Sequence, residues 1–285
     1  MKSWLLYFLA ILIAVITLPL IAKNSIAAQK EPMITVCING QTSEMSIEEY
    51  SLRAMAAVGM HCGENDSLCA LAIAARSCGY YFSLYGGKHD SFDVCGSGDC
   101  CIALADPTEC DGDKLALYIA ALEKTYGEIL FYENDAVCTL FTLCAGSGTA
   151  DCESFPYLIS VGEDIICDTH VTEKQIDKSA FSEEFPNLAS ENTCFVYGDH
   201  GSCEFGVVNG KLVDSEKIAE MLSLPCTEFS LTSVENDIVI TAQGVGHDHG
   251  LSLCGASEKA SRGYTYEKIL EFYFPLLKLR KLYTS

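Results

Sequence analysis

Two groups of residues in this chain have the types and spacing to do chemistry. The first gathers one imidazole and three thiols within thirteen residues: His89, Cys95, Cys100 and Cys101. Zn²⁺ accepts imidazole and thiolate ligands in tetrahedral geometry. These ligand types therefore predict a structural zinc site at His89, Cys95 and Cys101, with Cys100 as a fourth ligand or an alternative third, although the spacing is not one of the common zinc-finger patterns. A disulfide from Cys95 to Cys101 or Cys100 is the competing interpretation.

The second group is a glycine-rich cassette near the C-terminus, Gly244-Val-Gly-His-Asp-His-Gly-Leu-Ser-Leu-Cys-Gly-Ala256. Glycine lets the backbone approach a ligand closely, and each imidazole can donate or accept a hydrogen bond. The cassette is therefore a candidate ligand-binding loop, in which His247 either contacts the ligand or orders the loop. A tight turn with solvated histidines is the alternative.

Composition limits the function classes. The formal net charge is −21, which argues against nucleic acid as a partner because such proteins need a basic surface. Trp4 to Ala22 is an uncharged, apolar run long enough to span a bilayer. We expect a single-pass anchor with the body outside the cytoplasm; a cleaved signal peptide is the alternative. All sixteen cysteines follow this run, and an exported protein of this kind is typically disulfide-bonded.

Local signals predict the helices. Ser46 with Glu49 forms a capping box for a helix that ends near residue 60. A second helix is expected over about 66–84, with small residues that favour close packing. A third is expected over 113–126, because Gly127 follows it.

Strands are expected after these three helices. Residues 128–132 and 137–143 have strand composition and are predicted to pair with each other. Asn209-Gly210 marks a hairpin. Because helices and strands mix without regular βαβ alternation, the fold class is α+β, with mixed helices and antiparallel strands.

The cassette and the segment after it, Arg262 to Pro275, resemble the end of the stage II sporulation protein D family. There, a Gly-His-Gly-x-Gly-Met-Ser-Gln-Tyr-Gly-Ala segment precedes a Tyr-x-x-Ile-Leu-x-x-Tyr-Tyr-Pro helix. The resemblance covers roughly 47–275. Four further blocks occur in the family's order: Glu49-Tyr50, Ala70 to Ser77, His89 to Cys95 and Pro156 to Val161.

The family comprises membrane-anchored lytic transglycosylases of peptidoglycan and their relatives. The resemblance therefore implies an anchor and linker over 1–29, then one extracytoplasmic domain over 30–285 that cleaves or binds glycan strands. It implies a role in sporulation and cell-wall remodelling, with partners in a wall-remodelling complex. Some relatives bind zinc with one histidine and two cysteines in the segment that contains His89.

The family's reaction needs a carboxyl group that protonates the glycosidic oxygen, and burial must raise its pKa. In the family this is the Glu of Glu-Met-Pro. Counting back from Arg76 gives Val58, or Gly59 with a one-residue deletion, so no carboxylate stands at that position. Glu64 is a nearby substitute, and a helix N-cap is the alternative role for it. The chain is expected to cleave glycan slowly, or to bind it without cleavage.

The resemblance also implies residues that contact the substrate. Arg76 is one of them, although pairing with an acid at the edge of the core is its alternative role. The family's Ser-Gln-Tyr is Ser252-Leu253-Cys254 here, so two polar side chains of the groove segment are missing. The expected substrate contacts are Arg76, Gly146, Ser147, Gly148, His247 and Ser252.

Overall fold

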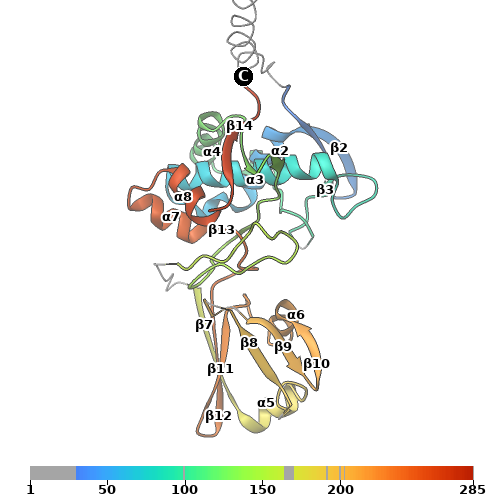
Figure 1. The fold of residues 1–285 in the computed structure, drawn as a ribbon, viewed down its shortest axis with the longest axis vertical. Coiled ribbons are helices and arrows are strands. Elements are labelled where there is room, and N and C mark those ends of the chain that lie inside the picture. The colour runs from blue at the N-terminus through green and yellow to red at the C-terminus, as the bar shows by residue number, and fades with distance from the viewer. Residues whose placement is uncertain are drawn as a thin grey trace, which may run out of the picture.

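A computed structural model describes residues 30–98, 100–163, 170–190, 192–198, 200–201 and 203–284. These residues form two lobes joined at a narrow waist (Figure 1). The predicted α+β class is confirmed. In the described ranges no helix is both long and apolar enough to cross a membrane. The expected anchor, Trp4 to Ala22, lies outside the described residues.

The first lobe is built on helices and carries both ends of the described chain (Figure 1). Its central helix, α3, is buried on every side from Ser67 to Tyr80. The alanines of this helix let its neighbours approach closely, as expected. The lobe's helices are α2 (Ile47–Val58), η1 (Gly59–His61), α3 (Asn65–Tyr85), η2 (Pro107–Glu109), α4 (Gly112–Lys124), α7 (Leu253–Ser261) and α8 (Tyr266–Tyr273).

Three small sheets complete the helical lobe. The order β2-β1-β3 joins an antiparallel and a parallel pair, β14-β4-β5 is antiparallel, and β13 lies parallel to β6. The strands are β1 (Met33–Ile38), β2 (Gln41–Ser46), β3 (Val94–Cys95), β4 (Glu128–Tyr132), β5 (Asp135–Ala136), β6 (Phe141–Thr142), β13 (Leu251–Ser252) and β14 (Lys278–Lys281).

The second lobe, which we call the β lobe, has its own apolar core, including Phe181, Ile218 and Phe229. Two antiparallel three-stranded sheets form it, in the orders β11-β12-β7 and β10-β9-β8. Its elements are β7 (Val171–Asp177), α5 (Lys178–Glu184), β8 (Cys194–Tyr197), β9 (Cys203–Val208), β10 (Lys211–Asp214), α6 (Ser215–Met221), β11 (Phe229–Val234) and β12 (Asp237–Gln243).

Most predicted boundaries follow from local chemistry. The Ser46 side chain accepts a hydrogen bond from Glu49 N, which begins α2 as expected. Asn209 and Gly210 both have positive φ, as a two-residue hairpin turn requires. One strand pairing was predicted wrongly: β4 pairs with β14 and β5, not with 137–143. The chain beyond β5 instead leaves the sheet and reaches β6, which pairs with β13.

Candidate functional site

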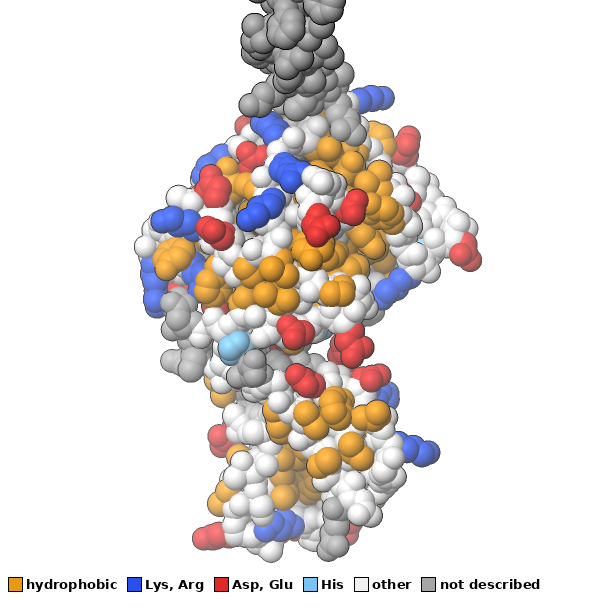
Figure 2. Space-filling view, viewed as in Figure 1, with side chains coloured by type: hydrophobic (Ala, Val, Ile, Leu, Met, Phe, Trp, Pro, Cys, Tyr) orange, Lys and Arg blue, Asp and Glu red, His pale blue; other side chains and the backbone are white. Residues whose placement is uncertain are grey.

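A groove of about 900 Å³ lies at the waist between the lobes. The loop after β6, strands β9 and β10, and the loop before β13 contribute its walls. Figure 2 shows acidic side chains gathered at this waist. None of the described residues lining it is Lys or Arg; its charged and imidazole side chains are Asp151, Glu153, Glu204, Asp214, Glu216, His200, His247 and His249.

Two histidines of the predicted cassette line the groove, and their hydrogen bonds fix their tautomers. His247 Nδ1 accepts from the backbone N–H of His249 at 3.1 Å, so the proton of its neutral form is on Nε2. His249 Nδ1 lies 3.1 Å from the Ala150 carbonyl, which can only accept, so this nitrogen carries its proton. The rings are stacked, with centroids 5.4 Å apart. His247 Nε2–H lies near the Phe141 carbonyl, so the Nε2 acceptor of His249 is the ring atom left for a ligand.

Burial keeps His247 neutral. Burial, together with the nearby His249 imidazole, lowers the pKa of His247 to about 4. A neutral imidazole near pH 7 brings no charge into the groove. The acceptor nitrogen of His249 is suited to a sugar hydroxyl, which can donate to it.

The glycine loop predicted to contact substrate leads into the groove wall, but Gly146, Ser147 and Gly148 are not among the lining residues. Ser147 donates from its backbone N–H and its hydroxyl to the Glu228 carboxylate, at 2.8 and 2.5 Å. Gly148 makes room for His200, because a Cβ there would lie 2.6 Å from the His200 Cβ. Thr149 and Ala150 then line the groove. The loop thus positions the groove wall, and Gly146 leaves space for Glu228.

Two carboxyl groups beside this loop have raised pKa values. Burial raises the pKa of Asp248 to about 7, against the lowering effect of hydrogen bonds from Thr227. Burial also raises the pKa of Glu228, and the Ser147 hydrogen bonds oppose it. Neither side chain is among those lining the groove. Asp248 therefore holds a proton for part of the time at neutral pH, but its side chain does not line the groove.

The remaining predicted residues have structural contacts. Arg76 is fully buried and pairs with Glu48 at 2.7 Å. Glu64 is the N-cap of α3, where its side chain accepts from the backbone of Ser67 in a capping box. Ser252 is buried and caps α7 by accepting from Gly255 N. These contacts match the alternative roles of Arg76 and Glu64.

The position of the missing acid is at the end of α2. Val58 is the last residue of this helix and packs against the apolar core. Gly59 is buried, and a Cβ there would lie 2.9 Å from the Tyr118 ring. Neither residue lines the groove, and neither side chain can transfer a proton.

The predicted histidine–cysteine group comes together. His89, Cys95, Cys100 and Cys101 have ligand atoms that all lie within 4.8 Å of one another. His89 Nε2 is 3.5 Å from the sulfurs of both Cys100 and Cys101. We call these four residues the first cluster. They could hold a metal ion.

Strand β3 and its loop hold the first cluster in place. Cys95 pairs with Cys37 of β1, and Gly96 N donates to the Cys37 carbonyl at 3.0 Å. The Cys101 backbone N–H donates to the Ser97 carbonyl at 3.0 Å, which turns the chain back toward Cys95. Burial raises the pKa of the Cys101 thiol to about 12. A cation would be needed to hold these thiols together as thiolates.

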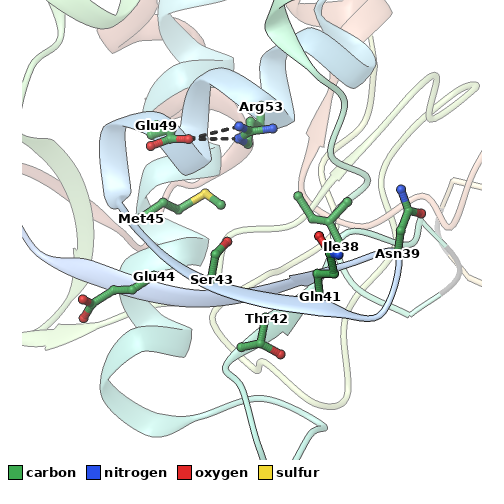
Figure 3. A pocket seen from close by; sticks show the side chains of 9 residues that line it. All are labelled: Ile38, Asn39, Gln41, Thr42, Ser43, Glu44, Met45, Glu49 and Arg53. Atoms are coloured by element: carbon green, nitrogen blue, oxygen red, sulfur yellow. Dashed lines mark hydrogen bonds and ion pairs between the residues drawn. The ribbon is translucent and has the colours of Figure 1, made fainter.

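A second hollow, of about 490 Å³, lies beside the β1–β2 hairpin (Figure 3). It is lined by uncharged residues of the hairpin together with Glu44, Glu49 and Arg53. Glu49 and Arg53 form an ion pair across one turn of α2, at 3.1 Å. Its described lining has no histidine or cysteine, so we do not assign it a catalytic role.

Sequence reasoning missed His200 and the acidic lining of the groove. His200 lies in the β lobe, and glycines on both sides, Gly198 and Gly201, were the only local signal. Glu204, Asp214 and Glu216 look like ordinary surface acids in the sequence. They line the groove only because β9, β10 and the start of α6 face the helical lobe.

Comparisons with known proteins are consistent with the sequence motifs. No protein-family model matches the chain. Stage II sporulation protein D of Bacillus subtilis (strain 168) is 26% identical over 172 residues, covering 56% of this chain and 50% of that protein. The Bacillus amyloliquefaciens protein of the same name is 27% identical over 165 residues, or 54% and 48%. The chain thus spans about half the length of the curated relatives it matches. It is a divergent relative of the stage II sporulation protein D family.

Proposed function

We propose that this protein binds peptidoglycan glycan strands during the wall remodelling of sporulation, and that it cleaves them slowly or not at all. The similarity to stage II sporulation protein D supports the biological setting. The stacked pair of His247 and His249 on the groove is the observation that carries glycan binding. The lack of a carboxyl group at Val58 or Gly59 supports weak catalysis or none.

A scaffold in a wall-remodelling complex is the second candidate within this proposal. The two lobes give it an extended surface, and a scaffold needs no catalytic acid (Figure 1). Glycan binding at the groove is compatible with it.

The charge of the groove predicts which glycans bind best. Its five carboxylates repel anions, and denuded strands carry a free lactyl carboxylate on each muramic acid residue. Neutral sugars should therefore bind more tightly than denuded strands. Salt screens repulsion between exposed charges, since the Debye length falls from about 10 Å at 0.1 M to about 3 Å at 1 M. Binding of denuded strands should strengthen as salt rises.

A pelleting assay with the full-length protein in mild detergent tests this proposal. We expect binding to insoluble glycan strands, several-fold weaker binding for the His247→Ala/His249→Ala variant, and no release of anhydro-muropeptides by mass spectrometry. Glu204→Gln/Glu216→Gln should strengthen binding of denuded strands, and Glu109→Gln, on the exposed η2 turn, is the matched control. Rapid release of anhydro products that Glu64→Gln abolishes would instead make Glu64 the acid. Absence of binding to any glycan would refute the proposal.

We also propose zinc as the metal of the first cluster. A histidine with two or three cysteines is a ligand set that zinc favours, and three sulfurs exclude hard cations such as Mg²⁺ and Ca²⁺. The ion would close the 89–101 loop on itself next to β1, so its role would be structural.

The location outside the cytoplasm belongs to the same proposal. The apolar run from Trp4 to Ala22 supports an anchor in the cell membrane. The described chain begins and ends at the end of the helical lobe away from the β lobe, so an anchor there would leave the groove accessible (Figure 1). Protease added to intact protoplasts should remove the body. A body that stays protected until the cells are lysed would contradict this location.

A further inference from the structure

A second group of metal-ligating side chains lies apart from the first cluster. Cys144, His170 and Cys254 have ligand atoms that all lie within 4.8 Å of one another. Cys254 Sγ is 4.0 Å from His170 Nδ1. We call these residues the second cluster. They come from the loop after β6, the residue before β7 and the first turn of α7.

Backbone hydrogen bonds hold these three segments together. Cys144 forms a two-way bridge with Val245, with N–O distances of 3.1 and 2.8 Å. The His170 carbonyl accepts from Gly244 N at 2.9 Å, and Cys254 N donates to the Leu143 carbonyl at 3.0 Å. Ligands held by the main chain are pre-organised, so metal binding would need little further ordering.

The close approach of the backbone depends on glycine. Gly244 has a φ of +112°, and a Cβ there would lie 2.6 Å from the Cys144 carbonyl oxygen. A side chain at this position would push apart the strands that place Cys144 and His170. The glycine-rich cassette therefore holds Cys144 and His170 in place through the backbone of Gly244 and Val245.

The spacing of the atoms suits a transition metal. With bonds of roughly 2.3 Å to sulfur and 2.0–2.1 Å to nitrogen, tetrahedral zinc places a sulfur and a nitrogen roughly 3.5 Å apart. The sulfur–nitrogen distance of 4.0 Å needs a contraction of about half an ångström, which side-chain rotation supplies. Cys78 and Cys138 differ from this cluster. Their sulfurs lie 3.1 Å apart in the core, and no histidine is grouped with them among the described residues.

The charges around the second cluster also favour a cation. A carboxylate lies near Cys144, because Glu228 accepts two hydrogen bonds from Ser147, three residues further along the chain. Two thiolates in such surroundings repel one another unless a positive charge lies between them. A divalent ion with two thiolates and one neutral imidazole is electrically balanced, and its binding releases the two thiol protons.

We propose that Cys144, His170 and Cys254 bind a transition-metal ion of the zinc type, separate from the first cluster. The described residues supply three of the four ligands of a tetrahedral site. Cys144 is buried, whereas His170 and Cys254 are partly exposed. Helix α7, which carries Cys254, also contacts the turn after η1: Gly63 N donates to Ser257 Oγ at 2.8 Å.

Metal counting on the full-length protein, purified in mild detergent under reducing conditions without chelator, tests this proposal. We expect two zinc ions per chain by elemental analysis. Cys254→Ser/His170→Ala should retain one, and His89→Ala/Cys95→Ser should retain the other. Cys110→Ser changes a half-buried cysteine outside both clusters and should retain two. The second site would be overturned if the unmodified protein held one zinc ion and the Cys254→Ser/His170→Ala variant still held it.

A cobalt spectrum tests the second cluster in a variant whose own ligands there are unchanged, so a folding defect cannot imitate the result. In His89→Ala/Cys95→Ser the second cluster is intact, so added Co²⁺ should give thiolate-to-cobalt charge-transfer absorption at one ion per chain. Circular dichroism checks that each variant is folded. No such absorption in this folded variant, or a mapped Cys144–Cys254 disulfide in the purified protein, would refute the proposal. Glycan binding is measured separately, so its failure leaves this result unaffected.

Discussion

Glu48→Ala should lower the free energy of unfolding by about 3–5 kcal/mol, the cost of leaving a buried charge without its partner. Arg76 has a fully buried side chain, and Glu48 is only 14% exposed. Glu48 accepts from Arg76 Nε and Nη2 at 2.9 and 2.7 Å, and also from Tyr283 OH at 2.8 Å. Gly127 N also donates to this carboxylate at 3.2 Å, and alanine removes all four contacts at once.

The neighbouring residue provides a matched control. Glu49 is 48% exposed, and its partner Arg53 lies on the surface of α2 (Figure 3). An exposed pair of this kind contributes about 0–1 kcal/mol. Glu49→Ala should therefore change stability little, although the two substitutions delete the same atoms from adjacent positions.

Thermal and urea unfolding measure the difference. At about 2–4 °C per kcal/mol for a chain of this size, Glu48→Ala should lower Tm by roughly 6–20 °C. Equal Tm changes for Glu48→Ala and Glu49→Ala would contradict a structural role for Arg76. Loss of glycan binding without loss of stability in Glu48→Ala would restore the substrate-binding role.

Removal of metal from the first cluster should cause the other large effect. Metal that binds only the folded chain adds its binding free energy to stability, about 4 kcal/mol when its free concentration is a thousand times Kd. Cys95→Ser should lose one ion per chain and lower Tm, and a chelator should lower the Tm of the unmodified protein. The reason is that the ion joins the 89–101 loop to itself next to β1.

Cys37→Ser is the control for this cluster. Cys37 pairs with Cys95 across β1 and β3 but is not among the grouped ligands. It should retain the metal and respond to chelator as the unmodified protein does. A disulfide at Cys95 predicts the reverse pattern: reductant lowers Tm, chelator has no effect, and the intact mass is two protons lighter per bridge.

Features governed by neighbouring residues could be predicted from the sequence. Ser46 and Glu49 set the start of α2 because a cap satisfies backbone N–H groups within one turn. Asn209 and Gly210 form a hairpin because both tolerate positive φ. The first cluster was found for the same reason, since its four ligands lie within thirteen residues and a short loop can bring them together.

Only the tertiary structure decided features that depend on remote segments. Strand β4 pairs with β14, more than a hundred residues later, because hydrogen bonding in a sheet depends on which edge is available and not on sequence distance. Arg76 could face substrate or core until α3 was seen to be buried on every side. Cys144, His170 and Cys254 have no common motif. They meet because long-range backbone pairing brings β6, the start of β7 and α7 to one place, and local sequence carries no record of such pairing.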